Sequence, residues 1–288
     1  MIVEVIKAGL YTTLQDGGRI SCAHLGIPSG GAMDMDSYEL CNMILGNDSN
    51  EPAIECTMLG PVLSFDRSTT IAITGSDLSP MINKNLIALH KSISVNSGDQ
   101  LSFGRLNNGC RCYIGIAGSW QIERWQGSVS PLSYGEVLSQ HILKKGSKLE
   151  ITPTTTMDQQ QPTIELNKKV SIGSPHIIEI FVGPEMYLFK ADDLKTFLST
   201  LYKVSNAANR MGYKLVGEPL NMDGIPPMIS SGIIPGTVQM TSSGTPIILC
   251  RDAQTIGGYP RIGVLSASSL NQMAHIKPGD QIKFKLIS

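Results

Sequence analysis

The chain has 288 residues, of which 41% are hydrophobic and 16% charged, and its formal net charge is -1 at pH 7. Without an excess of basic residues it has no electrostatic means of attracting a nucleic acid or an anionic membrane surface, and we expect neither partner. No apolar run approaches the roughly 20 residues of a membrane-spanning helix, and the N-terminus lacks a signal-peptide pattern. We therefore expect a cytoplasmic protein whose length allows two domains.

Short apolar or alternating segments recur along the chain, separated by turns rich in Gly, Pro, Asn and Ser. This spacing predicts a mainly β protein with few helices. The predicted strands are Ile2–Ile6, Val62–Phe65, Thr70–Thr74, Ile93–Val95, Gln100–Phe103, Arg111–Ala117, Ile177–Val182, Lys214–Val216, Thr237–Met240, Ile247–Leu249, Ile262–Leu265 and Gln281–Leu286.

Three short helices are predicted between these strands. The first begins at Asp36, whose carboxylate would cap the first turn while Glu39 reaches back, and it ends at Gly46–Asn47. The second follows an apolar stripe from Leu194 to Leu201, and the third covers Ser268–Ala274.

The chain divides at a polar segment of low complexity that starts at Pro153. We predict a first domain over residues 1–152, a linker over 153–165 and a second domain over 166–288. A tight turn and strand at Ser97–Phe103 is matched by Pro278–Phe284, which suggests that the two halves are related barrels.

The six cysteines lie in apolar or mixed segments without the spacing of metal ligands, so we expect reduced core thiols and no metal site. Cys110 and Cys112 would lie on one face of a strand. The sequence has no Gly-Lys dipeptide, no Gly-x-Gly-x-x-Gly before a helix, no His-Glu-x-x-His and no Gly-x-Ser-x-Gly. These absences exclude the usual phosphate loop, zinc proteases and α/β-hydrolases.

Two glycine-rich polar loops, one near each end of the chain, suggest a cleft built from distant segments. In the N-terminal loop, Arg19 could pair with a carboxylate, His24 could transfer a proton, and the amides of 29–31 could face an anion. The alternative is that Gly17–Gly18 forms only a hairpin turn and that His24 is an ordinary loop residue.

The C-terminal loop, Arg251–Gly263, follows an apolar strand. Asp252 and Gln254 could bind a small amide or carboxylate, Tyr259 could supply a hydroxyl group, and Arg261 could hold an anion. The alternative is a structural Asp–Arg pair that braces a barrel mouth.

Two further residues are ambiguous in the same way. Asp77 follows a predicted strand and could be an acid, a base or only a turn cap. Arg210 precedes a glycine, where a plain turn and a ligand contact are both open.

Six motifs stand in order along nearly the whole chain: Thr12–Arg19, His24–Pro28, Gly31–Asp34, Ile73–Gly75, Asn209–Gly212 and Gln254–Pro260. Taken together, they resemble the family that contains the C subunit of prokaryotic 5-oxoprolinase, also known as allophanate hydrolase subunit 2, Kip antagonist or biotin-dependent carboxyltransferase.

The resemblance implies two cyclophilin-like β-barrel domains. It also implies partner subunits B and A, with which the chain would open the small molecule 5-oxo-L-proline to L-glutamate. ATP would be the cofactor, bound at a site shared with a partner, and Mg²⁺ could accompany it. The implied catalytic candidates are Asp77, Asp252 and His24. The implied substrate contacts are Arg19, Asp34, Arg210, Gln254, Tyr259 and Arg261.

Two alternatives remain open under the same resemblance. One is carboxyl transfer to urea or a related amide, with biotin on a separate carrier because this chain has no Met-Lys-Met sequence. Family members commonly have lysine after Gly-Gly-Tyr-Pro, whereas this chain has Arg261, which cannot act as a general base. The other alternative is a regulatory protein that binds a kinase-inhibiting partner.

Overall fold

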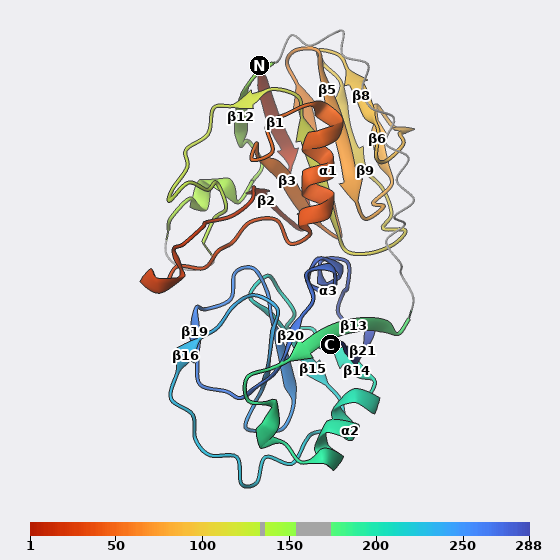
Figure 1. Ribbon diagram of the computed structural model, residues 1–288. Helices are drawn as coiled ribbons and strands as arrows, with labels where there is room; N and C mark the ends of the chain where they lie inside the picture. The colour runs from red at the N-terminus through yellow and green to blue at the C-terminus, as the bar shows by residue number, and fades with distance from the viewer. Residues whose placement is uncertain (133–135, 154–173) are drawn as a thin grey trace. The chain divides into compact units, whose positions relative to one another are not determined.

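The computed structural model describes residues 1–132, 136–153 and 174–288 (Figure 1). The chain forms two compact units: Met1–Arg19 with Gly30–Ser171, and Ile20–Ser29 with Ile172–Ser288. The chain thus enters the second unit at residue 20 and returns to the first at residue 30, a crossing that the sequence-based division does not contain. Apart from Pro153, the predicted linker over 153–165 lies outside the described residues.

The expected mainly β fold is confirmed, with three α-helices in the described part of the chain. None of the helices described is long and apolar enough to cross a membrane.

The first unit contains two antiparallel sheets with strand orders β11-β12-β1-β4-β9-β6-β7 and β2-β3-β10-β5-β8. The seven-stranded sheet consists of β1 (Ile2–Lys7), β4 (Val62–Phe65), β6 (Pro80–Ile82), β7 (Asn85–Leu86), β9 (Gln100–Phe103), β11 (Ser119–Trp120) and β12 (Lys148–Thr152). The five-stranded sheet consists of β2 (Tyr11–Gln15), β3 (Ala53–Thr57), β5 (Thr69–Gly75), β8 (Ser92–Val95) and β10 (Arg111–Ile116).

The two sheets share one apolar core, to which β1 contributes Val3 and Val5 and β10 contributes Ile114 and Ile116. The opposite face of the five-stranded sheet is covered by α1 (Met35–Leu45), which lies along it (Figure 1). Because both faces are covered, every residue of β10 is buried, including Arg111 at its start.

The N-cap of helix α1 lies two residues earlier than predicted. Asp34 has an extended backbone and its side chain accepts a hydrogen bond from the Ser37 amide, so Asp34 is the N-cap. The prediction of Asp36 as the cap is wrong, since Asp36 lies in the first helical turn. The helix ends as predicted at Gly46, which has a φ of 65°.

The second unit is a closed barrel with strand order β13-β20-β17-β18-β15-β14-β21. Strands β13 and β21 pair in parallel, and the other neighbours are antiparallel. The barrel strands are β13 (His176–Val182), β14 (Tyr202–Val204), β15 (Gly212–Val216), β17 (Thr237–Met240), β18 (Pro246–Leu249), β20 (Arg261–Leu265) and β21 (Gln281–Leu286).

Shorter elements surround the barrel. Helix α2 (Ala191–Ser199) packs on it through Phe197, whose ring centre lies 4.6 Å from that of Phe284. Helix α3 (Ala267–Met273) follows β20, and β16 (Ser231–Gly232) pairs with β19 (Ile256–Gly257) in a separate two-stranded sheet. The 3₁₀ turns are η1 (Ala23–Leu25), η2 (Ser139–His141) and η3 (Met186–Leu188).

The repeated sequence motif corresponds to a repeated structure. Gly98 before β9 and Gly279 before β21 have φ values of 88° and 92°. The side chains of Asp99 and Asp280 each accept a hydrogen bond from the amide three residues earlier, at 2.8 and 3.0 Å. The same turn therefore starts an equivalent strand in each unit.

Candidate functional site

A buried carboxylate, that of Asp16, joins separate segments of the first unit. Its Oδ1 accepts hydrogen bonds from the Gly18 amide at 2.9 Å and the Ser128 hydroxyl at 2.6 Å. Its Oδ2 accepts from the Val129 amide at 2.8 Å and pairs with Arg124 at 3.0 Å. The Asp16 side chain is fully buried, and these four donors compensate the desolvation of its charge. Asp16 therefore fixes the turn after β2.

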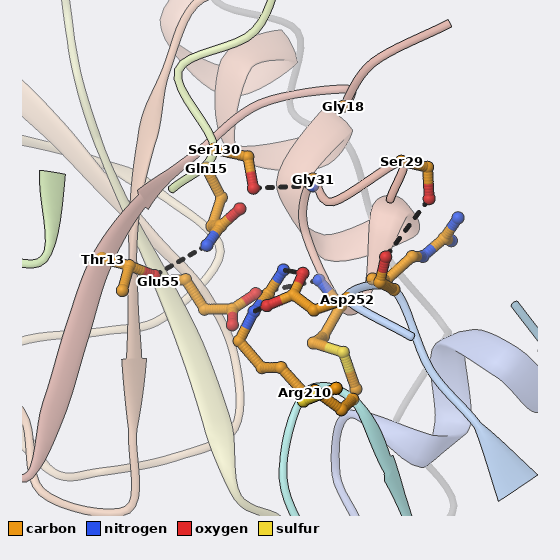
Figure 2. Close-up of polar contacts among 12 residues, drawn as sticks. Thr13, Gln15, Gly18, Ser29, Gly31, Glu55, Ser130, Arg210 and Asp252 are labelled. Atoms are coloured by element: carbon orange, nitrogen blue, oxygen red, sulfur yellow. Dashed lines mark hydrogen bonds and ion pairs between the residues drawn. The ribbon is translucent and has the colours of Figure 1, made fainter. Parts of the chain in front are cut away.

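Arg19, a predicted substrate contact, is buried in the same network. Its Nη2 donates to the Ser130 carbonyl, and its Cζ lies 5.2 Å from the centre of the Trp125 ring, within cation–π distance. The Ser130 hydroxyl accepts from the Gly31 amide at 3.0 Å (Figure 2). Gly31 has a φ of 82°, and a Cβ there would lie 2.8 Å from the Gly18 nitrogen, so this approach requires glycine.

The amides of these glycine turns donate within the first unit. Gly17 donates to the Asn50 side chain at 3.0 Å, Gly18 to the Asp16 carboxylate at 2.9 Å, and Gly31 to the Ser130 hydroxyl at 3.0 Å. A phosphate cradle needs several amides directed at the ligand. These three amides instead donate to side chains of the protein itself.

A second buried carboxylate, Glu55 on β3, lies on the face of the sheet that α1 covers. Its Oε2 accepts from the Met33 amide and the Tyr113 hydroxyl, both at 2.9 Å, and its Oε1 lies 3.6 Å from Arg111 Nε. Tyr113 Oη also accepts from the Asp34 amide at 2.7 Å. Burial, and then the Glu55 charge, raise the pKa of Tyr113 well above its usual value, so the phenol stays protonated. This network anchors the start of α1.

Two predicted site carboxylates cap turns in the first unit. Asp34 accepts from the Ser37 amide at 3.2 Å and from its hydroxyl. Asp77 accepts from the Ser79 amide at 2.8 Å and the Asn107 side chain at 2.9 Å. For Asp77 this is the turn-cap geometry that the sequence left open.

In the second unit, Arg210 and Asp252 form a two-pronged ion pair (Figure 2). The distances from Nε to Oδ2 and from Nη2 to Oδ1 are both 2.8 Å. Both side chains are buried. An Asp–Arg brace was one of the two interpretations of the C-terminal loop, and the partner of Asp252 is Arg210, which lies outside that loop.

Arg261 is held by Glu185, a residue that sequence analysis did not single out. Arg261 donates through Nε to Glu185 Oε2 at 2.7 Å, through Nη2 to Oε1 at 2.5 Å, and through Nη1 to the Gly232 carbonyl at 2.9 Å. Hydrogen bonds from Arg261 lower the pKa of Glu185, and Glu185 raises the pKa of Arg261. Arg261 therefore joins β20 to β16 and to the turn before η3.

Three of the predicted site residues are exposed: His24 in η1, Gln254 before β19, and Tyr259 after it. The Tyr259 side chain is 44% exposed, while its carbonyl accepts a hydrogen bond at 3.3 Å from Gln239, which is buried on β17. The backbone that carries Tyr259 is thus held by the barrel, and its hydroxyl remains accessible to a ligand.

The two sequence loops meet within the second unit. The Ser29 hydroxyl donates to the Arg251 carbonyl at 3.3 Å, so the segment Ile20–Ser29, with His24, touches the loop that contains Gln254 (Figure 2). Arg19 and Asp34 belong to the first unit instead. His24, Gln254 and Tyr259 are therefore accessible polar groups of one unit. The charged residues of the same site form ion pairs with each other.

Sequence analysis did not identify Glu55 and Glu185 as members of these networks, and only Glu55 has a sequence pattern that could have indicated it. Glu55 stands alone in the apolar segment Ala53–Thr57, and a single carboxylate in a buried strand indicates a paired charge. Glu185 lies in an ordinary turn, where no pattern marks it. In the described ranges, no group of three or more His, Cys, Asp or Glu side chains is placed to hold a metal ion.

The fold and these networks define a class of protein: a two-unit β protein with a closed barrel, in which buried ion pairs support polar, glycine-rich loops. A family model described as the carboxyltransferase domain, subdomain A and B, matches residues 25–286. The chain belongs to this family.

Similar proteins come from two groups of enzymes. The chain is 32% identical to the C subunit of 5-oxoprolinase from Escherichia coli, a match that covers 98% of this chain and 90% of that protein. It is also 32% identical to the urea amidolyase of Lachancea kluyveri, over 99% of this chain but 17% of that protein.

The crystal structure of the Kluyveromyces lactis urea carboxylase matches with a TM-score of 0.88 and 29% identity, over 100% of this chain and 27% of that one. The chain thus corresponds to a small part of the length of the urea amidolyase and urea carboxylase chains. Its relatives are components of enzymes that act on amides or urea, which supports an enzyme-subunit role.

Proposed function

We propose that this chain is the C subunit of an ATP-dependent 5-oxoprolinase, which opens 5-oxo-L-proline to L-glutamate together with subunits A and B in the cytoplasm. The observation that carries the proposal is the match to the E. coli C subunit, of which 90% is covered. The urea amidolyase match covers only 17% of its relative. Because the E. coli protein is named as a subunit, the match also supports the proposal that this chain works together with partner subunits.

The lactam of 5-oxoproline is an unreactive amide, so ATP would serve to activate it. Phosphoryl transfer from ATP to the lactam oxygen, with release of ADP, would make the lactam carbon reactive towards water. Two water molecules would then complete the conversion to glutamate and inorganic phosphate. ATP, with Mg²⁺, would bind at a site shared with a partner.

The exposed groups of the second unit suit this substrate. Gln254 and Tyr259 present neutral donors and acceptors, which match a lactam N–H and C=O. Asp252 and Arg261 hold the loop in place through their ion pairs with Arg210 and Glu185, at 2.8 and 2.5 Å. We therefore assign substrate contact to Gln254 and Tyr259, proton transfer to His24, and loop support to Asp252 and Arg261.

Biotin-dependent carboxyl transfer is a second candidate, because the urea carboxylase structure matches over 100% of this chain. A separate biotin carrier would be needed. The pairing of Arg261 with Glu185 argues against proton transfer at the position after Gly-Gly-Tyr-Pro, since the arginine stays charged.

The test is 5-oxoproline-dependent formation of ADP and glutamate by this chain copurified with subunits A and B, with each protein omitted in turn. We expect turnover only with all three. Carboxylation of urea from a carboxybiotin carrier, without glutamate formation, would overturn the proposal in favour of the second candidate.

Variants then test the site itself. Gln254→Ala and Tyr259→Phe should lower kcat/KM without changing Tm, because both side chains are exposed. Gln281→Ala, an exposed glutamine on β21, is the matched control and should keep full activity. Full activity in both site variants would remove this loop from substrate binding.

A further inference from the structure

Two cysteines of the first unit lie side by side in its core. Cys56 on β3 and Cys112 on β10 are directly opposite each other in the antiparallel register. Their sulfur atoms are 2.9 Å apart, and both residues are buried free thiols. The sequence places Cys110 and Cys112 on one face of a strand, whereas the thiol in contact with Cys112 is that of Cys56 on the neighbouring strand.

The backbone around this pair suits a covalent bond. Two residues further along the strands, the Met58 amide donates to the Cys110 carbonyl at 2.7 Å, so Met58 and Cys110 form a hydrogen-bonded pair. Hydrogen-bonded and non-hydrogen-bonded pairs alternate along an antiparallel ladder. Cys56 and Cys112 are therefore also a hydrogen-bonded pair, with Cα atoms about 5.5 Å apart. This lies inside the range of about 4.4–6.8 Å that disulfides occupy. The sulfur atoms must approach by roughly 0.9 Å to reach a bond of about 2.05 Å.

We propose that Cys56 and Cys112 are a modification site, which forms a cross-strand disulfide when the protein meets a hydroperoxide. One thiolate attacks the peroxide O–O bond and becomes a sulfenic acid, and the released hydroxide takes up a proton to give water. The second thiolate displaces hydroxide from that sulfur and forms the S–S bond. Two thiol protons and two electrons thus convert hydrogen peroxide into two water molecules.

The buried position controls when this reaction occurs. Burial, with the neighbouring Cys56, raises the pKa of Cys112 well above its usual value, so the closed sheet holds few thiolates. The two thiols lie on β3 and β10, which are inner strands of the five-stranded sheet. Oxidation therefore proceeds through transient local opening of this sheet, and conditions that favour such opening accelerate it.

The disulfide would fix two strands that also carry the anchor of α1. The next residue pair in the same register is Glu55 with Tyr113, and these side chains point to the opposite face, where they hold the Met33 and Asp34 amides. Oxidation of the thiols would thus lock the strands beneath the start of the helix.

The experiment treats the full chain with hydrogen peroxide in buffer and in dilute urea, then unfolds and alkylates it and maps its peptides. We expect alkylation of four of the six cysteines, a peptide linked through Cys56 and Cys112, faster reaction in dilute urea, and reversal by dithiothreitol. Cys22→Ser is the matched control and should still form the bond.

Cys56→Ala and Cys112→Ala should abolish the linked peptide. Should either variant fail to fold, the peptide map of the unsubstituted chain decides alone. Retention of all six thiols, conversion to sulfinic or sulfonic acid, or a disulfide between other cysteines would overturn the proposal. None of these readouts depends on the proposed enzyme activity.

Discussion

Replacement of Glu185 by glutamine should destabilise the second unit by more than a surface substitution does. The Glu185 carboxylate accepts three hydrogen bonds from Arg261: from its amide at 3.0 Å, from Nε at 2.7 Å and from Nη2 at 2.5 Å. Glutamine offers one acceptor oxygen, and its amide nitrogen would face a guanidinium donor. At least one charge-assisted bond is therefore lost.

The expected size follows from these contacts. A hydrogen bond to a charged group contributes about 1.5–3 kcal/mol. The two side chains are 11% and 19% exposed, which places the pair between an exposed ion pair and a fully buried one, so we expect a loss of about 2 kcal/mol at neutral pH. For a unit of this size, this lowers Tm by about 8 °C.

The difference should depend on pH. Arg261 lowers the pKa of Glu185 from its ordinary value of 4.5. The stability that Glu185 contributes is therefore complete above pH 4.5 and is lost as the pH falls through the lower pKa of the folded state. The unsubstituted protein should converge with Glu185→Gln in acid.

Calorimetry and hydrogen exchange of second-unit peptides, between neutral pH and about pH 3, would measure this. The matched control is Glu179→Gln, which breaks an exposed pair with Lys285 (2.9 Å) and should change stability by less than about 0.5 kcal/mol. Both tryptophans, Trp120 and Trp125, lie in the first unit, so their fluorescence should report an unchanged transition. A loss for Glu185→Gln no larger than the control, or one that persists unchanged in acid, would refute the reasoning.

Asp16→Asn should destabilise the first unit by about 3 kcal/mol, because it removes a buried charge that has an ionic partner; tryptophan fluorescence during urea unfolding measures this. Gly244→Ala should prevent normal packing, since its Cβ would lie 2.1 Å from a backbone oxygen. Gly224→Ala, which also has a positive φ but open space, should cost only about 1 kcal/mol, and both are read out by thermal unfolding. Asp252→Asn should lower the free energy of unfolding by about 3 kcal/mol. The double variant Arg210→Met with Asp252→Leu should lose less stability than the sum of its two single variants. Additive losses would show that the two residues are not energetically coupled.

Strands whose own side chains alternate were predictable from sequence. Val62–Phe65 and Gln100–Phe103 have the predicted bounds, since each alternates toward the shared core. The polar residues from Thr12 onward instead predict the start of the N-terminal loop, and over Thr12–Gln15 that prediction is wrong because these residues belong to β2 (Tyr11–Gln15). Its Thr and Gln side chains are buried against β3, so tertiary packing decides their environment, and local polarity misleads.

The site was less predictable than the fold because its contacts are distant in sequence. The ion-pair partner of Asp252 is Arg210, 42 residues earlier in the sequence, and that of Arg261 is Glu185, 76 residues earlier. The sequence motifs identified three of these four residues, but they gave no means of matching carboxylates to arginines. Glu185 has neither periodicity nor a glycine pattern beside it, so only the folded register of the barrel locates it.

The crossing at Ile20–Ser29 has a consequence for the order of events on the ribosome. This segment is made early, yet the first strand of the barrel in its unit, β13, begins only at His176. At roughly 5–20 residues per second, the intervening chain takes roughly 7–30 s to emerge. By the end of that delay the first unit is complete and can close, with the Ala32 amide bonded to the Asp16 carbonyl at 2.9 Å. The segment between Asp16 and Ala32 then still lacks the barrel against which it packs. A gene fragment encoding only 172–288 would thus produce a barrel that lacks one of its own pieces.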